Sequence, residues 1–166
     1  MSSIAIITAR GGSKRIPKKN IKEFCGKPII EYSIQAALES GVFDEVMVST
    51  DSEEIAEIAR RAGANVPFMR SEFTSSDFAT TKDVLNEVLS CYARNSGRFE
   101  IMCCLYPTAP FVTAEKLRRA YEILLKTGAD SVMPVVRFSY PTQRALVMRD
   151  GMLQYHYPEN FSNRSR

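Results

Sequence analysis

Short apolar runs alternate with longer amphipathic segments along most of this chain, and no internal repeat interrupts them. This alternation is the strongest constraint on the fold, because strands that alternate with helices indicate a mostly parallel sheet with helices on both faces. We therefore expect an α/β, Rossmann-like fold in a single domain that spans residues 1–166. The expected strands are residues 4–8, 43–49, 65–69, 101–105 and 131–136, and the expected helices are residues 28–40, 51–61, 80–94 and 114–126.

The expected helices carry signals at their ends. Pro28 suits a first helical turn, and Gly41 stands just past the end of the same segment. Thr113 precedes the last helix as a candidate cap. Asp51 and Glu54 have the spacing of a capping box, so we interpret Asp51 as a helix cap rather than a metal ligand.

Residues 139–157 depart from this pattern. Asp150-Gly151 is the strongest short hairpin signal in the chain, and segments 145–148 and 152–157 flank it. A hairpin appended to a parallel sheet is typical of an arm that contacts a partner subunit, or of a lid. An ordinary edge hairpin stays an alternative.

A loop rich in positive charge follows the first expected strand. Residues 10–27 hold seven Lys or Arg residues and a single acid, Glu23. Ligands of parallel sheets bind beyond the carboxyl ends of the strands, where this loop begins. Gly11 and Gly12 allow backbone N–H groups to approach a ligand, so the loop has the features of a polyphosphate site. The cations expected to neutralise the phosphates are Arg10, Lys14, Lys18 and Lys19.

Two other interpretations of the charged loop are a solvated surface and a nucleic-acid site. Gly11-Gly12 and Pro17 favour a shaped loop over a plain surface, and Phe24 is its only aromatic residue, which argues against stacking on bases. No nucleic-acid partner is therefore expected. The Walker A and G-x-G-x-x-G patterns are both missing, so side-chain charge and loop amides must hold the phosphates.

Composition narrows the expected compartment, the kinds of metal site and the possible membrane partners. The four cysteines show no C-x-x-C spacing, which suits reduced, buried thiols in a cytoplasmic protein. A single histidine, His156, makes a zinc site improbable and is expected to pack or hydrogen-bond within the hairpin. The apolar run at residues 4–7 is far too short for a membrane span, so no membrane partner is expected.

Several motifs together resemble one family. The string ARGGSK followed by KN, within residues 9–20, is similar to the signature of the CMP-sialic acid synthetases, also called acylneuraminate cytidylyltransferases. Two segments near the end, PTQRAL and NFSNRS, most resemble the pseudaminic acid branch of that family. The other matching strings are VSTDSEEIAEIA at 48–59, PFMR at 67–70, SDFATT at 76–81 and YPTAPF at 106–111.

This resemblance implies a reaction between CTP and an acidic nonulosonic sugar, most simply pseudaminic acid. The anomeric hydroxyl attacks the α-phosphorus, a CMP-sugar forms, and pyrophosphate leaves. Such a reaction needs no protein nucleophile, so the residues position the reactants and stabilise charge. The resemblance also implies Mg²⁺ as cofactor and a homodimer in which the hairpin arm of residues 139–157 helps to build the partner's sugar pocket.

The family pattern also assigns residues by position. Arg10 and Lys19 match the catalytic triphosphate contacts. Capping stays a competing role for the pair Thr80-Thr81. The matching nucleotide-binding residues are Ala9, Gly11, Gly12, Ser13, Lys14, Asn20, Arg70, Ala79 and Thr81, and the matching sugar-binding residues are Tyr106, Gln143, Arg144 and Arg164.

Two features depart from the family pattern. Sialic acid synthetases show Gln where this chain has Tyr106, so an ordinary sialic acid is not the expected sugar. The sequence stops at Arg166, whereas family members continue with an Asp-containing metal motif, so the C-terminal part and the metal ligands are expected beyond Arg166. The alternatives are a Kdo or other sugar nucleotidyltransferase, or a non-catalytic nucleotide-binding module. Thr108 stands where the Kdo branch carries an acidic residue, which makes a Kdo nucleotidyltransferase the less favoured alternative.

Overall fold

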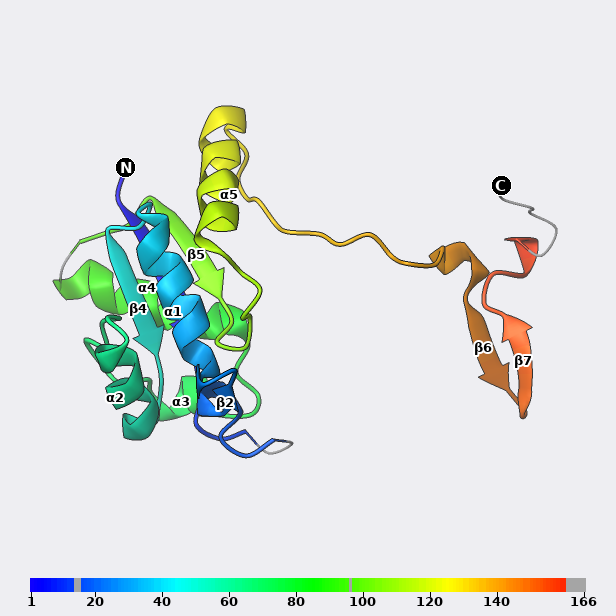
Figure 1. Ribbon diagram of the computed structural model, residues 1–166, viewed down its shortest axis with the longest axis horizontal. Coiled ribbons are helices and arrows are strands. Elements are labelled where there is room, and N and C mark those ends of the chain that lie inside the picture. Colours follow the sequence, from blue (N-terminus) through cyan, green and yellow to red (C-terminus); the bar gives the residue numbers. More distant parts are fainter. Residues whose placement is uncertain (14–15, 96, 161–166) are drawn as a thin grey trace. The chain divides into compact units, whose positions relative to one another are not determined.

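The computed structural model of the chain describes residues 1–13, 16–95 and 97–160 (Figure 1). Contacts divide the chain into two compact units, Met1–Val132 and Met133–Arg166. Whether residues 1–166 act as one domain stays a prediction.

The first unit is built on a parallel sheet of three strands. These are β1 (Ser3–Thr8), β4 (Glu45–Ser49) and β5 (Ile101–Leu105), in the spatial order β4-β1-β5. Their register pairs Ile4 with Glu45 on one side and with Met102 on the other. Because all three strands run in the same direction, their carboxyl ends meet at one edge of the sheet, and the loops of a ligand site belong at that edge.

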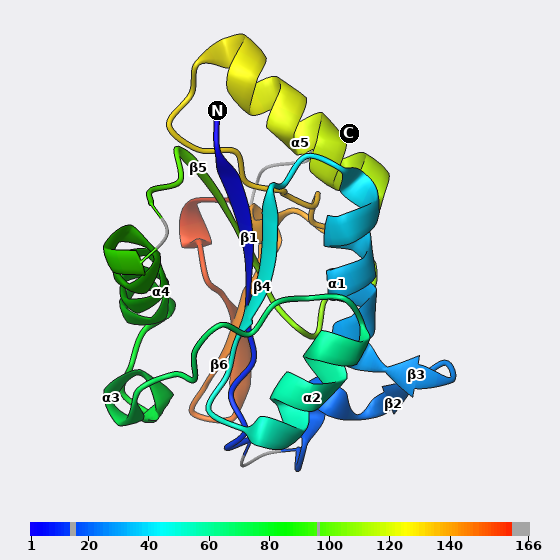
Figure 2. The ribbon, with the colours of Figure 1, turned by 90° about the vertical axis from the view of Figure 1, so that its left-hand side faces the viewer.

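Helices cover both faces of this sheet, as the alternation predicts. Side chains along β1 point to opposite faces in turn, and each face has its own buried cluster. Ala5 and Ile7 pack under α1 (Ile29–Ser40), α2 (Glu53–Arg61) and α5 (Ala114–Thr127), while Ile4 and Ile6 pack under α4 (Thr81–Asn95). Figure 2 shows α4 on one side of the sheet and α1 and α2 on the other.

Local signals set the ends of α1 and α5. Pro28 precedes α1, and Gly41 ends it with a φ of 66°, a left-handed conformation that glycine adopts without strain. The Thr113 side chain accepts a hydrogen bond from the Lys116 amide and so caps α5 as predicted. The two helices are joined where Arg118 donates to the Glu39 carbonyl at 2.9 Å, which satisfies an acceptor left free at the end of α1.

The strand expected at residues 65–69 is not formed. Asn65 makes a single parallel bridge to Met47, and the chain then continues without a ladder until the Arg70 amide donates to the Thr50 carbonyl at 2.8 Å. Pro67 has no N–H to donate, so a regular ladder cannot pass through it. This segment still follows β4 closely, which brings Arg70 to the carboxyl edge of the sheet.

The strand expected at residues 131–136 is also wrong. This segment has no strand assignment, and its apolar side chains are exposed, with Val136 92% accessible. It contains Pro134 and spans the boundary between the two units. Its β-branched residues favour an extended backbone, but a strand also needs a neighbour, which propensity alone does not supply.

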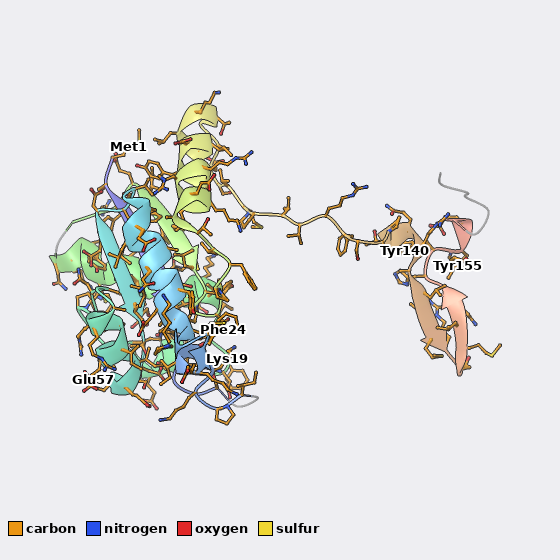
Figure 3. The ribbon with its side chains drawn as sticks, viewed as in Figure 1. Met1, Lys19, Phe24, Glu57, Tyr140 and Tyr155 are labelled. Atoms are coloured by element: carbon orange, nitrogen blue, oxygen red, sulfur yellow. The ribbon has the colours of Figure 1, made fainter. Side chains whose placement is uncertain are left out.

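Short elements that the periodicity did not predict lie between β1 and α1. They are a 3-10 turn η1 (Lys19–Ile21) and a small hairpin of β2 (Glu23–Phe24) and β3 (Lys27–Pro28). The Tyr32 hydroxyl donates to the Phe24 carbonyl at 2.9 Å, and the Lys27 ammonium lies 4.2 Å from the Tyr32 ring centre. Figure 3 shows Lys19 and Phe24 at the opposite end of the unit from Met1.

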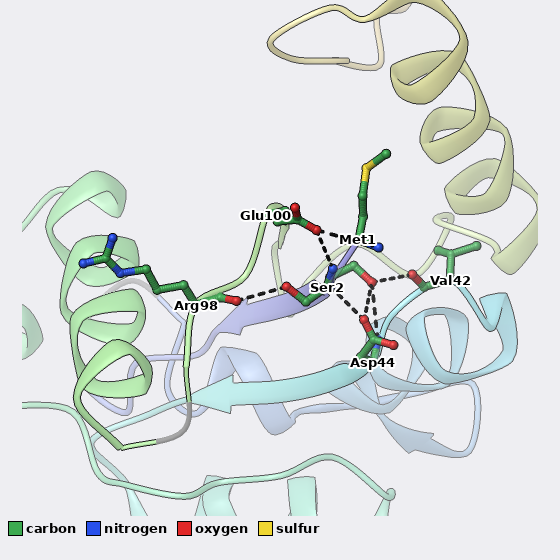
Figure 4. A network of polar contacts seen from close by, with 7 residues as sticks. Met1, Ser2, Val42, Asp44, Arg98 and Glu100 are labelled. Carbon is green, nitrogen blue, oxygen red and sulfur yellow. Dashed lines mark hydrogen bonds and ion pairs between the residues drawn. The ribbon is translucent and has the colours of Figure 1, made fainter.

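Polar contacts close the other edge of the sheet, where the strands begin (Figure 4). The Ser2 amide donates to Glu100 at 2.9 Å and the Ser3 amide donates to Asp44 at 2.8 Å. The Ser3 hydroxyl donates to the Val42 carbonyl at 2.7 Å. These contacts tie the start of β1 to the segments just before β4 and β5.

The second unit contains the predicted hairpin. Strands β6 (Leu146–Arg149) and β7 (Met152–Tyr155) pair antiparallel, between two short turns, η2 (Thr142–Arg144) and η3 (Pro158–Asn160). Asp150 and Gly151 both have positive φ, 50° and 76°, as a two-residue type I′ turn requires. His156 packs its ring on Tyr157, and its amide donates to the Ala145 carbonyl, which agrees with the structural role expected for it.

All four cysteines are free thiols. Cys25 is exposed because it lies in the turn between β2 and β3, and Cys91, Cys103 and Cys104 are only partly buried. The expectation of buried thiols is therefore wrong for Cys25 and met only in part by the other three. Burial in β5 raises the pKa of Cys103 to about 11. None of the helices in the described ranges combines the length and the hydropathy that a membrane span requires.

Candidate functional site

The candidate site is centred on the last residue of β4. The Ser49 carbonyl accepts the Ala9 amide at 2.9 Å and the Arg70 guanidinium at 2.6 Å. The Ser49 hydroxyl also accepts from Arg70 Nε at 3.1 Å. One residue thus joins the start of the charged loop to Arg70, two positions that lie far apart in the sequence. Ser49 itself was not among the expected site residues.

Asp51 binds the charged loop instead of capping α2. Its Oδ1 accepts the Gly11 amide at 2.7 Å. Helix α2 begins after Ser52, whose side chain makes no capping bond. Glu54, the other half of the expected capping box, forms an ion pair with Lys18 at 2.7 Å. The capping interpretation of Asp51 is therefore wrong, because a loop 40 residues away provides the donor.

Two of the loop amides expected to face phosphate donate within the protein. Gly11 N–H binds Asp51, and Ser13 N–H binds the Gly11 carbonyl at 2.9 Å. Gly12 is exposed at the tip of this turn. Lys14 lies outside the described residues.

Arg10 connects the loop to the segment that precedes α4. Its Nη1 donates to the Ser76 carbonyl at 2.9 Å and forms an ion pair with Asp77 at 2.9 Å. The buried Asn20 side chain donates to the Arg10 carbonyl at 2.8 Å, which fixes the backbone at the strand end. Lys19 is exposed at the start of η1. The Arg10 guanidinium thus already binds an anionic group, in the way that it would bind a phosphate.

Arg70 is partly buried, and its environment is mixed in charge. Burial lowers the pKa of its guanidinium from the usual value, the charges of Asp51 and Glu87 raise it, and Arg10 lowers it. Ser49 accepts hydrogen bonds from two guanidinium nitrogens of Arg70, Nε and Nη2, so this side chain is fixed before any ligand arrives. A fixed guanidinium suits recognition of a planar polar edge.

Glu87 on α4 anchors the segment that follows Arg70. It accepts the Ser71 amide and the Ser71 hydroxyl, both at 2.8 Å, and the Thr74 hydroxyl. These contacts hold the single-turn helix α3 (Glu72–Ser75). The sequence pattern identified neither α3 nor Glu87, because a carboxylate on a helix face carries no signal of the loop that it binds.

The two threonines at the start of α4 have different roles. Thr80 and Asp83 form a reciprocal cap, in which Asp83 accepts the Thr80 amide at 2.8 Å and the Thr80 hydroxyl accepts the Asp83 amide at 3.2 Å. Thr81 instead lies 3.5 Å from the Tyr106 hydroxyl, oxygen to oxygen. The capping role therefore belongs to Thr80, and Thr81 and Tyr106, two expected site residues, are brought together. Ala79, also expected at the site, is partly buried just before them.

The remaining expected sugar contacts belong to the second unit. Gln143 is exposed and Arg144 is partly buried, both in η2. Gln143 also lines an open hollow of about 750 Å³ that this unit forms by itself with residues 136–139, 141 and 142. Arg164 lies outside the described residues.

A metal site needs several ligand side chains close together. Among the side chains that the structure places, no three His, Cys, Asp or Glu residues gather closely enough to hold a metal ion. The carboxylates nearest the charged loop have protein partners, Asp51 with Gly11, Asp77 with Arg10 and Glu54 with Lys18. These residues do not fit a resident metal centre.

Comparison with known proteins decides the family. A sequence profile described as cytidylyltransferase matches residues 4–151. The chain belongs to the cytidylyltransferase family. The resemblance inferred from the motifs is thereby confirmed.

Named relatives of this cytidylyltransferase chain share much of its sequence. A pseudaminic acid cytidylyltransferase of Campylobacter jejuni subsp. jejuni serotype O:2 is 41% identical over the whole chain, which covers 72% of that protein. A CMP-N,N'-diacetyllegionaminic acid synthase of Legionella pneumophila is 41% identical over 81% of the chain, which covers 59% of that protein.

Solved structures agree on the fold. A CMP:2-keto-3-deoxy-manno-octonic acid synthetase complexed with CTP matches with a TM-score of 0.65 and 23% identity, over 78% of this chain and 49% of its own. The cytidylyltransferase chain thus spans about half the length of this structure. At this identity the match supports the α/β fold that the alternation predicts.

Proposed function

We propose that this chain carries out CTP-dependent cytidylyl transfer to an acidic nonulosonic sugar, with pseudaminic acid as the first candidate, and releases pyrophosphate. The relatives that match the whole chain carry that activity in their names. The observation that carries the proposal is that Ser49 binds both Arg70 and Ala9, the residue just before the charged loop, at the carboxyl edge of a parallel sheet.

Arg10 is proposed to stabilise the triphosphate. Its guanidinium binds a carboxylate and a carbonyl, so it is aimed at a site for negative groups. Charge on the phosphoryl oxygens grows as the anomeric hydroxyl attacks and pyrophosphate leaves, and a fixed cation lowers the barrier by meeting that charge. The exposed Lys19 ammonium can supply a second positive charge from η1.

Arg70 is proposed to read the cytosine. Its donors are oriented by Ser49, and Glu87 holds the segment that follows it. Ala79 and Thr81 are proposed to contact the base and the ribose. Fixed donors distinguish bases well, because a wrong base leaves a buried polar group without a partner.

Mg²⁺ is proposed as the cofactor, brought with the triphosphate, whose charge it neutralises.

The sugar is proposed to contact Tyr106 and residues of the second unit, namely Gln143, Arg144 and Arg164. We also propose a homodimer in which β6 and β7 contact a second copy. One face of this hairpin is apolar and exposed, which supports a protein partner there. The cytoplasm is the proposed location, supported by four thiols that are all free.

Titration calorimetry tests the nucleotide assignment. We expect the chain to bind CTP at least about tenfold more tightly than ATP or GTP, which corresponds to one well-placed polar contact. Arg10→Ala and Lys19→Ala should weaken CTP binding, and Lys126→Ala, on the far end of α5, serves as the control. Equal affinity for purine nucleotides would contradict the proposal. Pyrophosphate release with pseudaminic acid, compared with Kdo, then decides the sugar.

A further inference from the structure

Asp51 is the acidic residue whose position the proposed function does not explain. A site for a polyanion gains nothing from a carboxylate at its loop, since like charges repel. Yet Asp51 directly follows β4 and its Oδ1 accepts the Gly11 amide at 2.7 Å, a short distance typical of a charge-assisted bond. It does not cap α2, because that helix begins after Ser52.

The chain around this contact is closely packed. A Cβ atom added to Gly11 would lie 3.0 Å from Ser52 Cβ and 3.6 Å from Asp51 Oδ1. The loop after β1 therefore crosses directly over the first residues after β4. At Gly12, the next position, the nearest atom to such a Cβ would be Arg10 Nε at 4.0 Å. The close approach is thus specific to the residue that Asp51 binds.

The charge of the same carboxylate also acts on Arg70. Burial lowers the pKa of the Arg70 guanidinium, and the charge of Asp51 opposes that shift. Asp51 thus acts on both the charged loop and Arg70.

We propose that Asp51 is a positioning residue that fixes the Gly11 amide and thereby the shape of the phosphate loop beside Arg10. It acts through the loop and contacts neither nucleotide nor metal. This inference rests on the proposed function, because the loop is assigned there to the triphosphate. A loop already held in its binding shape loses less conformational freedom when the ligand binds, and this gain offsets the repulsion.

Three variants separate geometry from charge. In Asp51→Asn the side-chain oxygen can still accept the Gly11 amide, so CTP affinity should stay within about threefold of the parent value. Asp51→Ala lacks the acceptor and should bind CTP roughly tenfold more weakly. Asp51→Glu keeps the charge but adds a methylene, so it should also bind weakly. If Asp51→Ala does not fold, the Asn and Glu variants decide between geometry and charge.

The titrations use CTP and CMP, each with Mg²⁺ and with EDTA. CMP lacks the β- and γ-phosphates, so its affinity should change by less than about threefold in every variant. The loss for CTP should be similar with and without the metal. Glu53→Gln, which removes a carboxylate paired with Arg60 on α2, is the control and should bind CTP like the parent.

Specific outcomes would overturn this role. An Asn variant as weak as Ala, or a Glu variant as tight as the parent, would show that charge matters rather than the hydrogen bond. A loss confined to Mg²⁺ conditions would make Asp51 a metal ligand. If the parent binds CTP and Asp51→Ala binds it equally well, this inference is wrong while the proposed function stands. If the parent shows no preference for CTP over ATP and GTP, both the proposed function and this inference are wrong.

Discussion

Gly11 and Gly12 look equivalent in the sequence, but their surroundings differ. Gly11 lies against Ser52 and Asp51, whereas Gly12 is open. Gly11→Ala should lower the free energy of unfolding by about 1–3 kcal/mol, since an added methyl group in a packed contact forces its neighbours to shift. Gly12→Ala should change it by less than about 0.5 kcal/mol. Urea denaturation of both variants measures the difference, and equal losses would show that the contact with Ser52 does not matter.

Some residues of the candidate site could be predicted from the sequence, and others could not. Arg10, Gly11, Asn20 and Arg70 were identified because they stand in short motifs. Their partners were not, since Asp51 meets Gly11 across 40 positions and Ser76 meets Arg10 across 66. Such contacts depend on which strands become neighbours. The sequence therefore identified the candidate ligand-binding groups better than the groups that hold them.

Among the elements, α3 and α4 are coupled by Glu87. Its pKa is lowered, because hydrogen bonds from Thr74 and Ser71 and the charge of Arg70 outweigh the effect of partial burial, which alone would raise it. A carboxylate with a lowered folded pKa stabilises the fold above its unfolded value of 4.5, and this contribution is lost as the pH falls through the lower folded value.

Glu87→Gln tests this coupling. At pH 7 the variant should be less stable by about 1 kcal/mol, a discounted value for charge-assisted bonds at a partly exposed site. The difference from the parent should shrink as the pH falls below about 4.5. Glu57→Gln, which removes a carboxylate from the exposed surface of α2 (Figure 3), serves as the control. Thermal unfolding between pH 3 and 7 gives the comparison, and a constant difference would contradict the assignment.

Periodicity predicted the four longer helices, α1, α2, α4 and α5, and the three strands of the parallel sheet, because each pattern reflects a face that the element buries. It failed at residues 65–69 and 131–136, where apolar residues do indicate an extended chain. Pairing decides whether such a chain becomes a strand, and Pro67 and Pro134 each remove a donor from these segments. Fold class was thus accessible from the sequence, while the extent of the sheet depended on pairings between distant residues.

At the scale of the whole molecule, the second unit carries the surface that is most relevant to oligomer formation. Residues Leu146, Met148, Leu153 and Tyr155 share one face of the hairpin, because Leu146 pairs with Tyr155 and Met148 with Leu153. Met148 and Leu153 are both 65% exposed. Gln154 lies on the other face. An exposed apolar face of this kind is expected to bind another protein surface. We propose that this surface is the same hairpin face, or residues next to it, on a second copy of the chain.

Leu153→Lys should therefore weaken a homodimer, whereas Gln154→Lys should not. Burying a leucine contributes about 1.5–3 kcal/mol, and in a two-fold symmetric dimer each substitution occurs twice, so the dissociation constant should rise by at least roughly a hundredfold. Sedimentation velocity across micromolar concentrations measures the shift toward monomer. A parent chain that stays monomeric over that range would refute the dimer. Equal dissociation of both variants would show that charge on the hairpin, rather than loss of its apolar face, causes the effect.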